Sequence, residues 1–285
     1  MEFLRATSWS DALSIKAGLP GAVPLAGGTD VMVEINFDRR RPEALLDLNP
    51  VGSLGEWARD DGHVTIGAGV PYTRLIDELG ADLPGLAMAS RTVGSPQIRN
   101  RGTLGGNLGS ASPAGDTHPV LLALNATVSA ESVRGSRSIA IDDYYLGVKK
   151  SALAADELIH SVRIPVGTGP CHFAKIGTRN AMVIAVCSVA VALHVSDRRV
   201  RTGIGSAAPT PRRSPEAEAF VASELDWSGL GPLDDALARQ FGALVAAAAV
   251  PINDVRGTAA YRRHAVGVLA RRTLSWAWEE YRACA

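Results

Sequence analysis

Two glycine-rich segments in the first half of the chain carry residue types that suit an anion. The first segment consists of Ala26, Gly27, Gly28, Thr29 and Asp30, and the second consists of Thr103, Leu104, Gly105, Gly106 and Asn107. Glycine accepts positive φ angles and lets a ligand come close to the backbone. Successive backbone N–H groups in such a turn form a concavity that binds phosphate. A helix that starts beside the turn adds free N–H donors and a partial positive charge.

Side chains in both segments extend this chemistry. Thr29, Thr103 and Asn107 can donate hydrogen bonds to phosphate oxygens. Asp30 can cap the backbone of a following helix or accept hydrogen bonds from ligand hydroxyls. One Gly-Gly turn is a weak signal because turns use glycine constantly. Two of them in one half of the chain indicate a ligand with two phosphates.

Other nucleotide and catalytic motifs are missing from the sequence. There is no G-x-x-x-x-G-K-[ST], and residues 203–208 fit G-x-G-x-x-A only formally, because Pro209 and Pro211 break the helix that should follow. There is no G-x-S-x-G, and the six histidines lack metal-ligand spacing. Cys171 and Cys187 fall in predicted strands. We therefore predict no catalytic side chain and no metal ligand in this chain.

Charge and cysteine content exclude several classes of protein. Lys plus Arg and Asp plus Glu number 29 each among 285 residues, so the net charge of zero gives no sign of a nucleic-acid partner. The three cysteines have no C-x-x-C spacing, which excludes a local iron–sulfur or zinc site and favours a reducing compartment. The longest apolar run, residues 181–195, is shorter than the roughly 20 residues that span a bilayer. We expect a cytoplasmic protein without a membrane span.

Short strands and helices must hold the two glycine segments in place. Residues 22–28 are predicted as a strand that ends in a glycine turn, and residues 29–37 as a short helix capped by Thr29 or Asp30. The stretch 99–116 has neither a strand nor a helix period, so we predict a loop there. The remaining predicted elements of this half are a hairpin at 54–69, helices at 71–79, up to Gly94 and at 116–124, and strands at 43–49, 126–132, 136–141 and 157–165.

The second half of the chain has a different pattern. Residues 172–180, the Val-rich run and residues 198–208 predict a small antiparallel sheet, with the Val-rich run as a long buried strand. Residues 234–249 and 260–283 have apolar residues at helical spacing. The Gly- and Pro-containing linker Val166–Pro170 marks a plausible domain boundary.

These motifs together resemble a known family. "PLAGGTDVMVEI", "GSPQIRNRGTLGGNLGSASPAGD" and "FAKIGTRNAMVIAVCSVAVAL" are similar to the FAD-binding medium subunit of the molybdenum hydroxylases, which include xanthine dehydrogenases and aerobic carbon monoxide dehydrogenases. The resemblance implies an α+β fold. Residues 1–169 would form a two-subdomain FAD-binding domain of the vanillyl-alcohol-oxidase (PCMH) type. Residues 170–285 would form a smaller C-terminal domain of antiparallel sheet and helices, of the carbon monoxide dehydrogenase flavoprotein type.

The resemblance also implies roles for single residues. In this family the two glycine segments hold the FAD pyrophosphate, and Asp116 matches an aspartate that hydrogen-bonds the cofactor. Ile159 falls where an aliphatic residue contacts the flavin through its backbone, and Lys175 matches a lysine near the pyrimidine end of the flavin. A cation there would stabilise the anion of the reduced flavin. Asn180 stands where carbon monoxide dehydrogenases carry a tyrosine, which argues against that branch.

Two arginines keep open roles at this point. Arg99 and Arg101 could bind phosphate, or they could support the second segment or face a partner subunit.

The implied function is that of an electron-transfer subunit. A molybdopterin centre on a large partner subunit would oxidise the substrate. Two 2Fe-2S clusters on a small subunit would pass electrons to FAD in this chain, which would hand them to NAD, oxygen or a quinone. A dimer of heterotrimers is the expected assembly. Two alternatives stay open: a self-sufficient flavin oxidase or reductase of the same fold, and a non-enzymatic assembly protein that binds FAD or phosphate.

Overall fold

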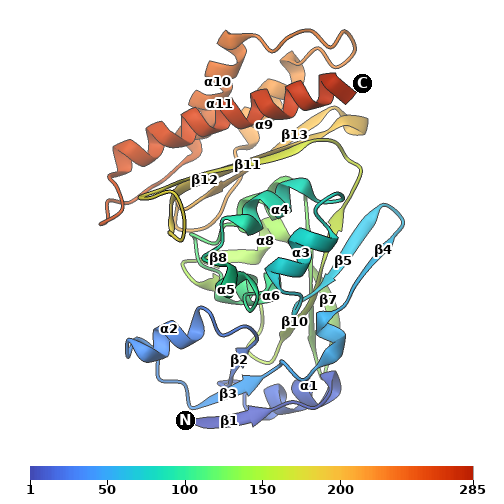
Figure 1. Ribbon diagram of the computed structural model, residues 1–285, viewed down its shortest axis with the longest axis vertical. Coiled ribbons are helices and arrows are strands. Elements are labelled where there is room, and N and C mark those ends of the chain that lie inside the picture. Colours follow the sequence, from blue (N-terminus) through green and yellow to red (C-terminus); the bar gives the residue numbers. More distant parts are fainter. Residues whose placement is uncertain (285) are drawn as a thin grey trace.

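The computed structural model describes residues 1–284, which form three larger sheets with helices packed between and around them (Figure 1). The first sheet is parallel, with the strand order β1-β3-β2. All four residues of the central strand β3 are buried. The elements of this part are β1 (Glu2–Arg5), α1 (Trp9–Gly18), β2 (Val23–Leu25), α2 (Val31–Asn36) and β3 (Ala44–Asp47).

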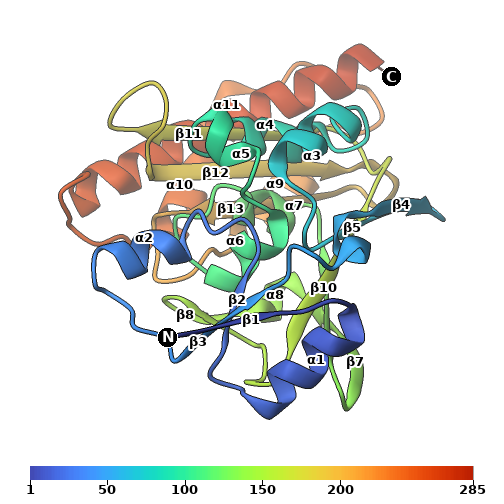
Figure 2. The same cartoon turned by 60° about the horizontal axis from the view of Figure 1, so that its bottom comes forward.

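Helix α2 packs only loosely against the rest of the protein. It follows the first glycine segment directly and none of its six residues is buried. Figure 2 shows α2 at the edge of the molecule, close to the hairpin of β8 (Tyr145–Gly147) and β9 (Lys150–Ser151). An ion pair between Glu34 and Lys149 joins the two segments. The apolar residues of the helix therefore stay largely in contact with solvent.

The second sheet is antiparallel and has the strand order β4-β5-β10-β6-β7. The predicted hairpin is confirmed, because β4 and β5 pair and Asp61 and Gly62 both have positive φ angles, 32° and 74°. This is the backbone conformation that a two-residue hairpin turn requires. The strands are β4 (Trp57–Asp60), β5 (His63–Gly67), β6 (Thr127–Ser132), β7 (Gly135–Ala140) and β10 (Leu158–Pro165).

Short helices fill the space between the second and third sheets. They belong to the long connection between β5 and β6 and to the segment after β7 (Figure 1). They are α3 (Tyr72–Glu78), α4 (Pro84–Arg91), α5 (Pro96–Arg99), α6 (Leu104–Ser110), α7 (His118–Ala123) and α8 (Ile141–Tyr144). A 3₁₀ helix, Gly52–Gly55, lies earlier in the chain, between β3 and β4.

A third, antiparallel sheet follows the linker. Its middle strand β12 is buried at all ten positions, because α11 covers one face and α7 the other. Ala190 and Ala192 accordingly belong to the core of the first part, whereas Val189 and Val191 belong to a second core beneath the C-terminal helices. The elements are β11 (Cys171–Gly177), β12 (Ala185–His194), the 3₁₀ helix Val195–Asp197, β13 (Arg199–Gly205), α9 (Pro215–Glu224), α10 (Asp235–Ala248) and α11 (Ala259–Cys284).

The structure confirms the α+β class and corrects the expectation of a loop at 99–116. Residues 104–110 are helical, because Thr103 accepts a hydrogen bond from the Gly106 N–H as an N-cap and Leu104 and Leu108 are fully buried at helical spacing. The expected cap on α2 is absent, since the Asp30 side chain makes no hydrogen bond to that helix. Within residues 1–284, no helix is long and apolar enough to cross a membrane.

Candidate functional site

The two glycine segments, far apart in sequence, meet in space. A Cβ atom on Gly27 would lie 1.8 Å from the Arg101 carbonyl oxygen, and one on Gly102 would lie 3.4 Å from Thr29 Oγ1. The first distance is far below any real Cβ contact, so the backbone at Gly27 touches the backbone that leads into the second segment. A side chain at Gly27 would push the two segments apart.

One asparagine that the sequence analysis missed holds the segments together. The Asn49 side-chain amide donates to the carbonyl oxygen of Ala26 at 3.0 Å, and its Oδ1 atom accepts from Arg101 Nη2 at 3.0 Å. Asp47 fixes the same amide at 2.6 Å. Asn49 belongs to no motif, and its place just after a buried strand was the only available signal.

The two arginines contact different parts of the protein. Arg101 donates to Asn49, and Arg99 donates to the carbonyl oxygens of Val93 and Gly94 at 3.1 Å, in the turn before α5. Of the three roles left open by the sequence, the contact with Asn49 favours support of the second segment for Arg101, whereas Arg99 supports the turn before α5.

The first segment offers its backbone to a ligand. No acceptor among residues 1–284 takes the backbone N–H groups of Gly27, Gly28, Thr29 or Asp30. Gly28 has a φ angle of 74°, which a glycine adopts without strain. Asp30 is exposed, so its carboxylate is free to accept from ligand hydroxyls. Four adjacent N–H groups without partners are the donors that an anion site needs.

The second segment offers less backbone and more side chain. The protein already uses the N–H of Gly105, which donates to the carbonyl oxygen of Ala68 at 3.2 Å, and that of Gly106, which donates to Thr103 Oγ1 at 2.9 Å. Leu104, the first residue of α6, keeps its N–H free as helix starts do. Asn107 Oδ1 accepts from Thr117 Oγ1 at 2.7 Å, which leaves the amide N–H groups of Asn107 for a ligand.

A buried ion pair lies between the second and third sheets. Lys175 Nζ on β11 lies 2.5 Å from Asp116 Oδ2 and 3.1 Å from the carbonyl oxygen of Thr92, and both charged side chains are under a tenth exposed. Thr92 Oγ1 also donates to Asp116 Oδ2 at 3.0 Å. Burial raises the pKa of the Asp116 carboxyl, and the Lys175 cation opposes that rise. The structure thus brings together the two residues that the family resemblance singled out.

Three buried polar atoms near this pair lack a partner among the described residues. They are Asp116 Oδ1, His118 Nε2 and the Tyr72 hydroxyl oxygen. The other ring nitrogen of His118 lies 2.7 Å from the Tyr145 hydroxyl, and burial lowers the pKa of His118 to about 3, so the ring is neutral. Unpartnered buried polar groups are costly, which makes them markers of a missing ligand or water.

Two residues named from the sequence do not join this cluster through any described side-chain contact. Ile159 is buried in the first core on β10, just before a bulge at His160. The His160 carbonyl accepts from the Ala68 N–H, so the bulge is one residue away from the support of Gly105. Asn180 lies exposed in the turn between β11 and β12.

Three features that the sequence analysis set aside have defined places in the structure. Residues 203–205 are strand rather than a nucleotide turn, and Gly203 is required because a Cβ atom there would lie 1.9 Å from the Pro119 carbonyl oxygen. Within residues 1–284, no three His, Cys, Asp or Glu side chains gather as a metal site. Cys171 and Cys187 are buried in strands, where burial raises the pKa of each thiol to about 12.

The fold and these paired segments define a domain that binds a diphosphate-containing cofactor. Residues 1–167 match the model of the FAD binding domain in molybdopterin dehydrogenase, and residues 172–277 match the CO dehydrogenase flavoprotein C-terminal domain. The chain belongs to this family of molybdopterin dehydrogenase flavoproteins. It is thus the FAD-binding component of an oxidoreductase, as the motifs predicted.

Individual relatives are similar to this chain over most of its length. The chain is 34% identical to the nicotine 6-hydroxylase medium subunit of Paenarthrobacter nicotinovorans, over 88% of this chain and 87% of that one. It is 33% identical to the carbon monoxide dehydrogenase medium chain of Afipia carboxidovorans, over 96% and 95%. The structure matches a chain of the reconstituted CO dehydrogenase from Oligotropha carboxidovorans with a TM-score of 0.88 at 30% identity, over 100% and 98% of the two chains.

The geometry of the site fits FAD. A Cβ atom on the exposed Gly106 would meet only Thr103 Oγ1, at 3.1 Å, so the space beside this residue is open to a ligand. The first segment adds four backbone N–H groups that have no acceptor among residues 1–284. Asp116 Oδ1, buried and without a partner, suits a hydroxyl or N–H donor of the cofactor. An FAD site requires backbone donors for the diphosphate and polar acceptors for the rest of the cofactor, and this site has both.

Proposed function

We propose that the two glycine segments jointly bind the diphosphate of FAD. Gly27, Gly28, Thr29 and Asp30 would bind it mainly through backbone N–H groups. Leu104 would contribute one N–H group, and Thr103 and Asn107 would contribute side-chain donors. The observation that carries this proposal is the backbone contact between Gly27 and Arg101, which brings the two segments side by side.

The other predicted residues would act on the rest of the cofactor. Asp116 would accept a hydrogen bond through its unpartnered Oδ1 atom, while Lys175 would set positive charge beside the flavin. Ile159 would contact the flavin through its backbone, next to the bulge on β10. FAD, when bound, accepts and passes on electrons. The chain's own residues bind and orient it and tune its electrostatics, so no side chain need act as an acid, base or nucleophile.

We also propose the assembly in which this chain works. Its relatives are named as medium subunits or medium chains, which supports a complex with a small iron–sulfur subunit and a large molybdopterin subunit. The expected form is a dimer of heterotrimers in the cytoplasm, with NAD, oxygen or a quinone as terminal acceptor. The identities to nicotine and carbon monoxide enzymes are nearly equal, so the argument from Asn180 against the second branch stays a prediction.

We keep the division into a FAD-binding domain of residues 1–169 and a C-terminal domain of residues 170–285 as a proposal. Two separate hydrophobic cores support it, one on each side of the third sheet. The sheet nevertheless belongs to both cores, because β12 contributes alternate side chains to each.

A glycine replacement tests the proposed diphosphate site. Gly106→Val places a branched side chain in the open space at the start of α6, and only Thr103 Oγ1 must give way within the protein. We expect a folded chain that no longer retains FAD. Gly18→Val is the matched control, because Gly18 is an exposed glycine at the end of α1 with no atom within 4 Å of its Cβ position. Equal flavin absorbance in both purified variants would refute the site.

A further inference from the structure

Helix α7 connects the candidate cofactor site to the third sheet. It begins two residues after Asp116, and all six of its residues are buried. Each strand of the sheet contacts this segment through a polar side chain: Lys175 on β11 binds Asp116, His194 on β12 binds the Ala123 carbonyl, and Arg201 on β13 binds the Leu122 carbonyl. The segment 116–123 is therefore held at both ends by the same sheet.

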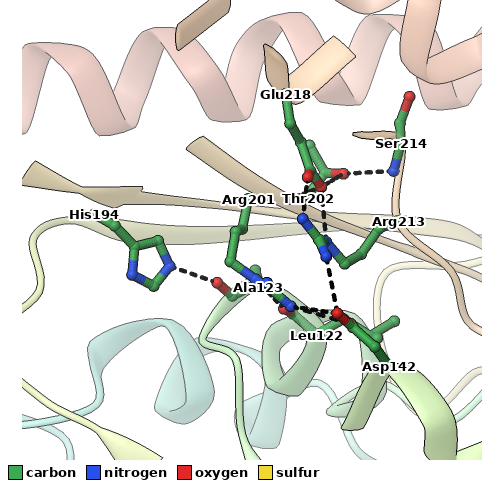
Figure 3. A network of polar contacts seen from close by, with 9 residues as sticks. All are labelled: Leu122, Ala123, Asp142, His194, Arg201, Thr202, Arg213, Ser214 and Glu218. Atoms are coloured by element: carbon green, nitrogen blue, oxygen red, sulfur yellow. Dashed lines mark hydrogen bonds and ion pairs between the residues drawn. The ribbon is translucent and has the colours of Figure 1, made fainter. Parts of the chain in front are cut away.

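The bonds at the far end of α7 are well defined (Figure 3). His194 Nε2 lies 2.9 Å from the Ala123 carbonyl oxygen, and Arg201 Nε donates to the Leu122 carbonyl oxygen at 3.1 Å. A carbonyl only accepts, so Nε2 of His194 carries the proton. Burial lowers the pKa of His194, so the ring donates as a neutral group. These two donors bind carbonyls at the end of the helix. The Leu122 carbonyl also accepts from the Asn125 N–H at 3.2 Å, so Arg201 adds a second hydrogen bond to it.

Arg201 is itself fixed by a network of charges. Its Nη2 atom lies 3.0 Å from both carboxylate oxygens of Asp142, and Arg213 Nη1 binds the same carboxylate at 2.8 Å. Arg213 also pairs with Glu218, which accepts from the backbone N–H and the hydroxyl of Thr202 at 2.8 and 2.7 Å. Figure 3 shows these side chains converging between α7, α8 and α9. The guanidinium that holds Leu122 therefore has little freedom to move.

The start of α7 lies directly on the strand that carries Arg201. A Cβ atom on Gly203 would lie 1.9 Å from the Pro119 carbonyl oxygen, and one on Gly205 would lie 2.7 Å from Pro119 Cγ. These two glycines thus allow the backbone of β13 to contact Pro119 at the start of the helix. A displacement of α7 along the strand would have to carry Asp116 with it.

We propose that Arg201 is a positioning residue for the FAD site. Through the Leu122 carbonyl it fixes α7, and α7 sets where the Asp116 carboxylate stands relative to Lys175. A rigid helix of two turns transmits a shift at one end to the other, and a charge-assisted hydrogen bond weakens when its geometry changes. This inference rests on the proposed role of Asp116 in cofactor binding.

The test compares the FAD affinity of single and double variants of the full chain. Arg201→Gln should weaken FAD binding by about threefold to thirtyfold, measured by quenching of flavin fluorescence on titration. Arg134→Gln is the control, because Arg134 makes a comparable two-bond pair with Asp156 at the surface, away from α7. It should bind FAD as the unchanged chain does. Arg201→Lys, which restores one charged donor, should recover part of the affinity.

The double variant separates positioning from general stability. In an Asp116→Asn background, Arg201→Gln should cause no further loss of FAD affinity, because the group that it positions is already disabled. Independent, multiplying effects of the two changes would overturn the inference, as would an Arg201→Gln chain that melts earlier but binds FAD normally. If Asp116→Asn alone leaves FAD affinity unchanged, the proposed role of Asp116 fails first, and the inference falls with it.

A second pair of variants covers the case in which Arg201→Gln does not fold. His194→Gln keeps an N–H donor for the Ala123 carbonyl and should retain most of the FAD affinity, whereas His194→Leu lacks the donor and should bind FAD less tightly. Equal affinities for these two variants would count against positioning through α7.

Discussion

The two glycine segments look alike in sequence but their backbones are used differently. The segment 27–30 has four N–H groups without acceptors, and it is followed by a helix with no buried residue and no side-chain cap. The segment 103–107 opens a helix that is capped by Thr103 and anchored by the buried Leu104 and Leu108. The first segment therefore has free backbone donors, while the second is a capped helix start that is anchored in the core and has fewer free donors. A glycine pair alone does not distinguish these two roles.

The largest effect is expected from a change that separates the segments. Gly27→Ala would set a methyl group 1.8 Å from the Arg101 carbonyl oxygen, so the backbone of one segment must move. We expect FAD affinity to fall on the order of a hundredfold, since overpacking of this kind typically costs a few kcal/mol. Isothermal titration with FAD measures the change. An affinity within twofold of the unchanged chain would show that the contact does not organise the site.

Acid should destabilise the FAD-free chain through the histidine beneath the second segment. Burial lowers the pKa of His118 from 6.5 to about 3. Between these two pH values the histidine is protonated in the unfolded chain but neutral in the folded chain. Stability is therefore lost as the pH falls from 6.5 toward 3, by roughly 2 kcal/mol between pH 6.5 and pH 5. Urea unfolding at a series of pH values measures this slope.

The histidine can be checked against a matched variant. His118→Gln should flatten the slope, whereas His264→Gln, at an exposed position on α11, should leave it as it is. If the dependence of stability on pH is unchanged in His118→Gln, another buried group that stays unprotonated in the folded chain must cause it.

A smaller effect is expected where the segments are bridged by a side chain. Asn49→Ala removes the hydrogen bonds to the Ala26 carbonyl and to Arg101. Net hydrogen bonds of this kind contribute about 1 kcal/mol, so FAD affinity should fall by roughly fivefold. Asn253→Ala, which removes an exposed amide bonded to the start of α11, serves as the control. Equal FAD affinity in the two variants would show that the bridge is dispensable.

The smallest effect separates the two helix starts. Thr103→Ala removes a cap bond and should cost about 1 kcal/mol in the free energy of unfolding. Asp30→Ala removes no cap bond and should change that free energy by less than about 0.5 kcal/mol. Chemical denaturation of both variants measures the difference. Equal losses would mean that Asp30 caps α2 after all.

Local patterns were enough to predict much of the fold. The Asp61-Gly62 turn, the buried Val-rich strand and the two long C-terminal helices each carry a clear period or turn signal, and the structure has all of them. Helix α6 escaped prediction because three glycines hid the spacing of Leu104 and Leu108. Gly105 is required by a tertiary contact, since a side chain there would clash with Ala68.

The candidate site was only partly visible in the sequence. The glycine pairs stood out by composition, but Asp116 and Lys175 lie far apart in the chain and only the family resemblance linked them before the structure did. Asn49 had only its place after a buried strand as a signal and Arg201 had none, because each acts through a backbone carbonyl whose partner is set by the fold. A side chain that bonds to a distant backbone carbonyl produces no recognisable spacing of residues in the sequence.

An experimental structure of the chain with FAD bound tests the central claim most directly. The quantities to measure are the distances from the backbone nitrogens of Gly28 and Leu104 to the phosphate oxygens. We predict that both segments lie within hydrogen-bonding distance, about 2.7–3.2 Å, of the same diphosphate. A diphosphate bound by only one segment, or by neither, would contradict the account.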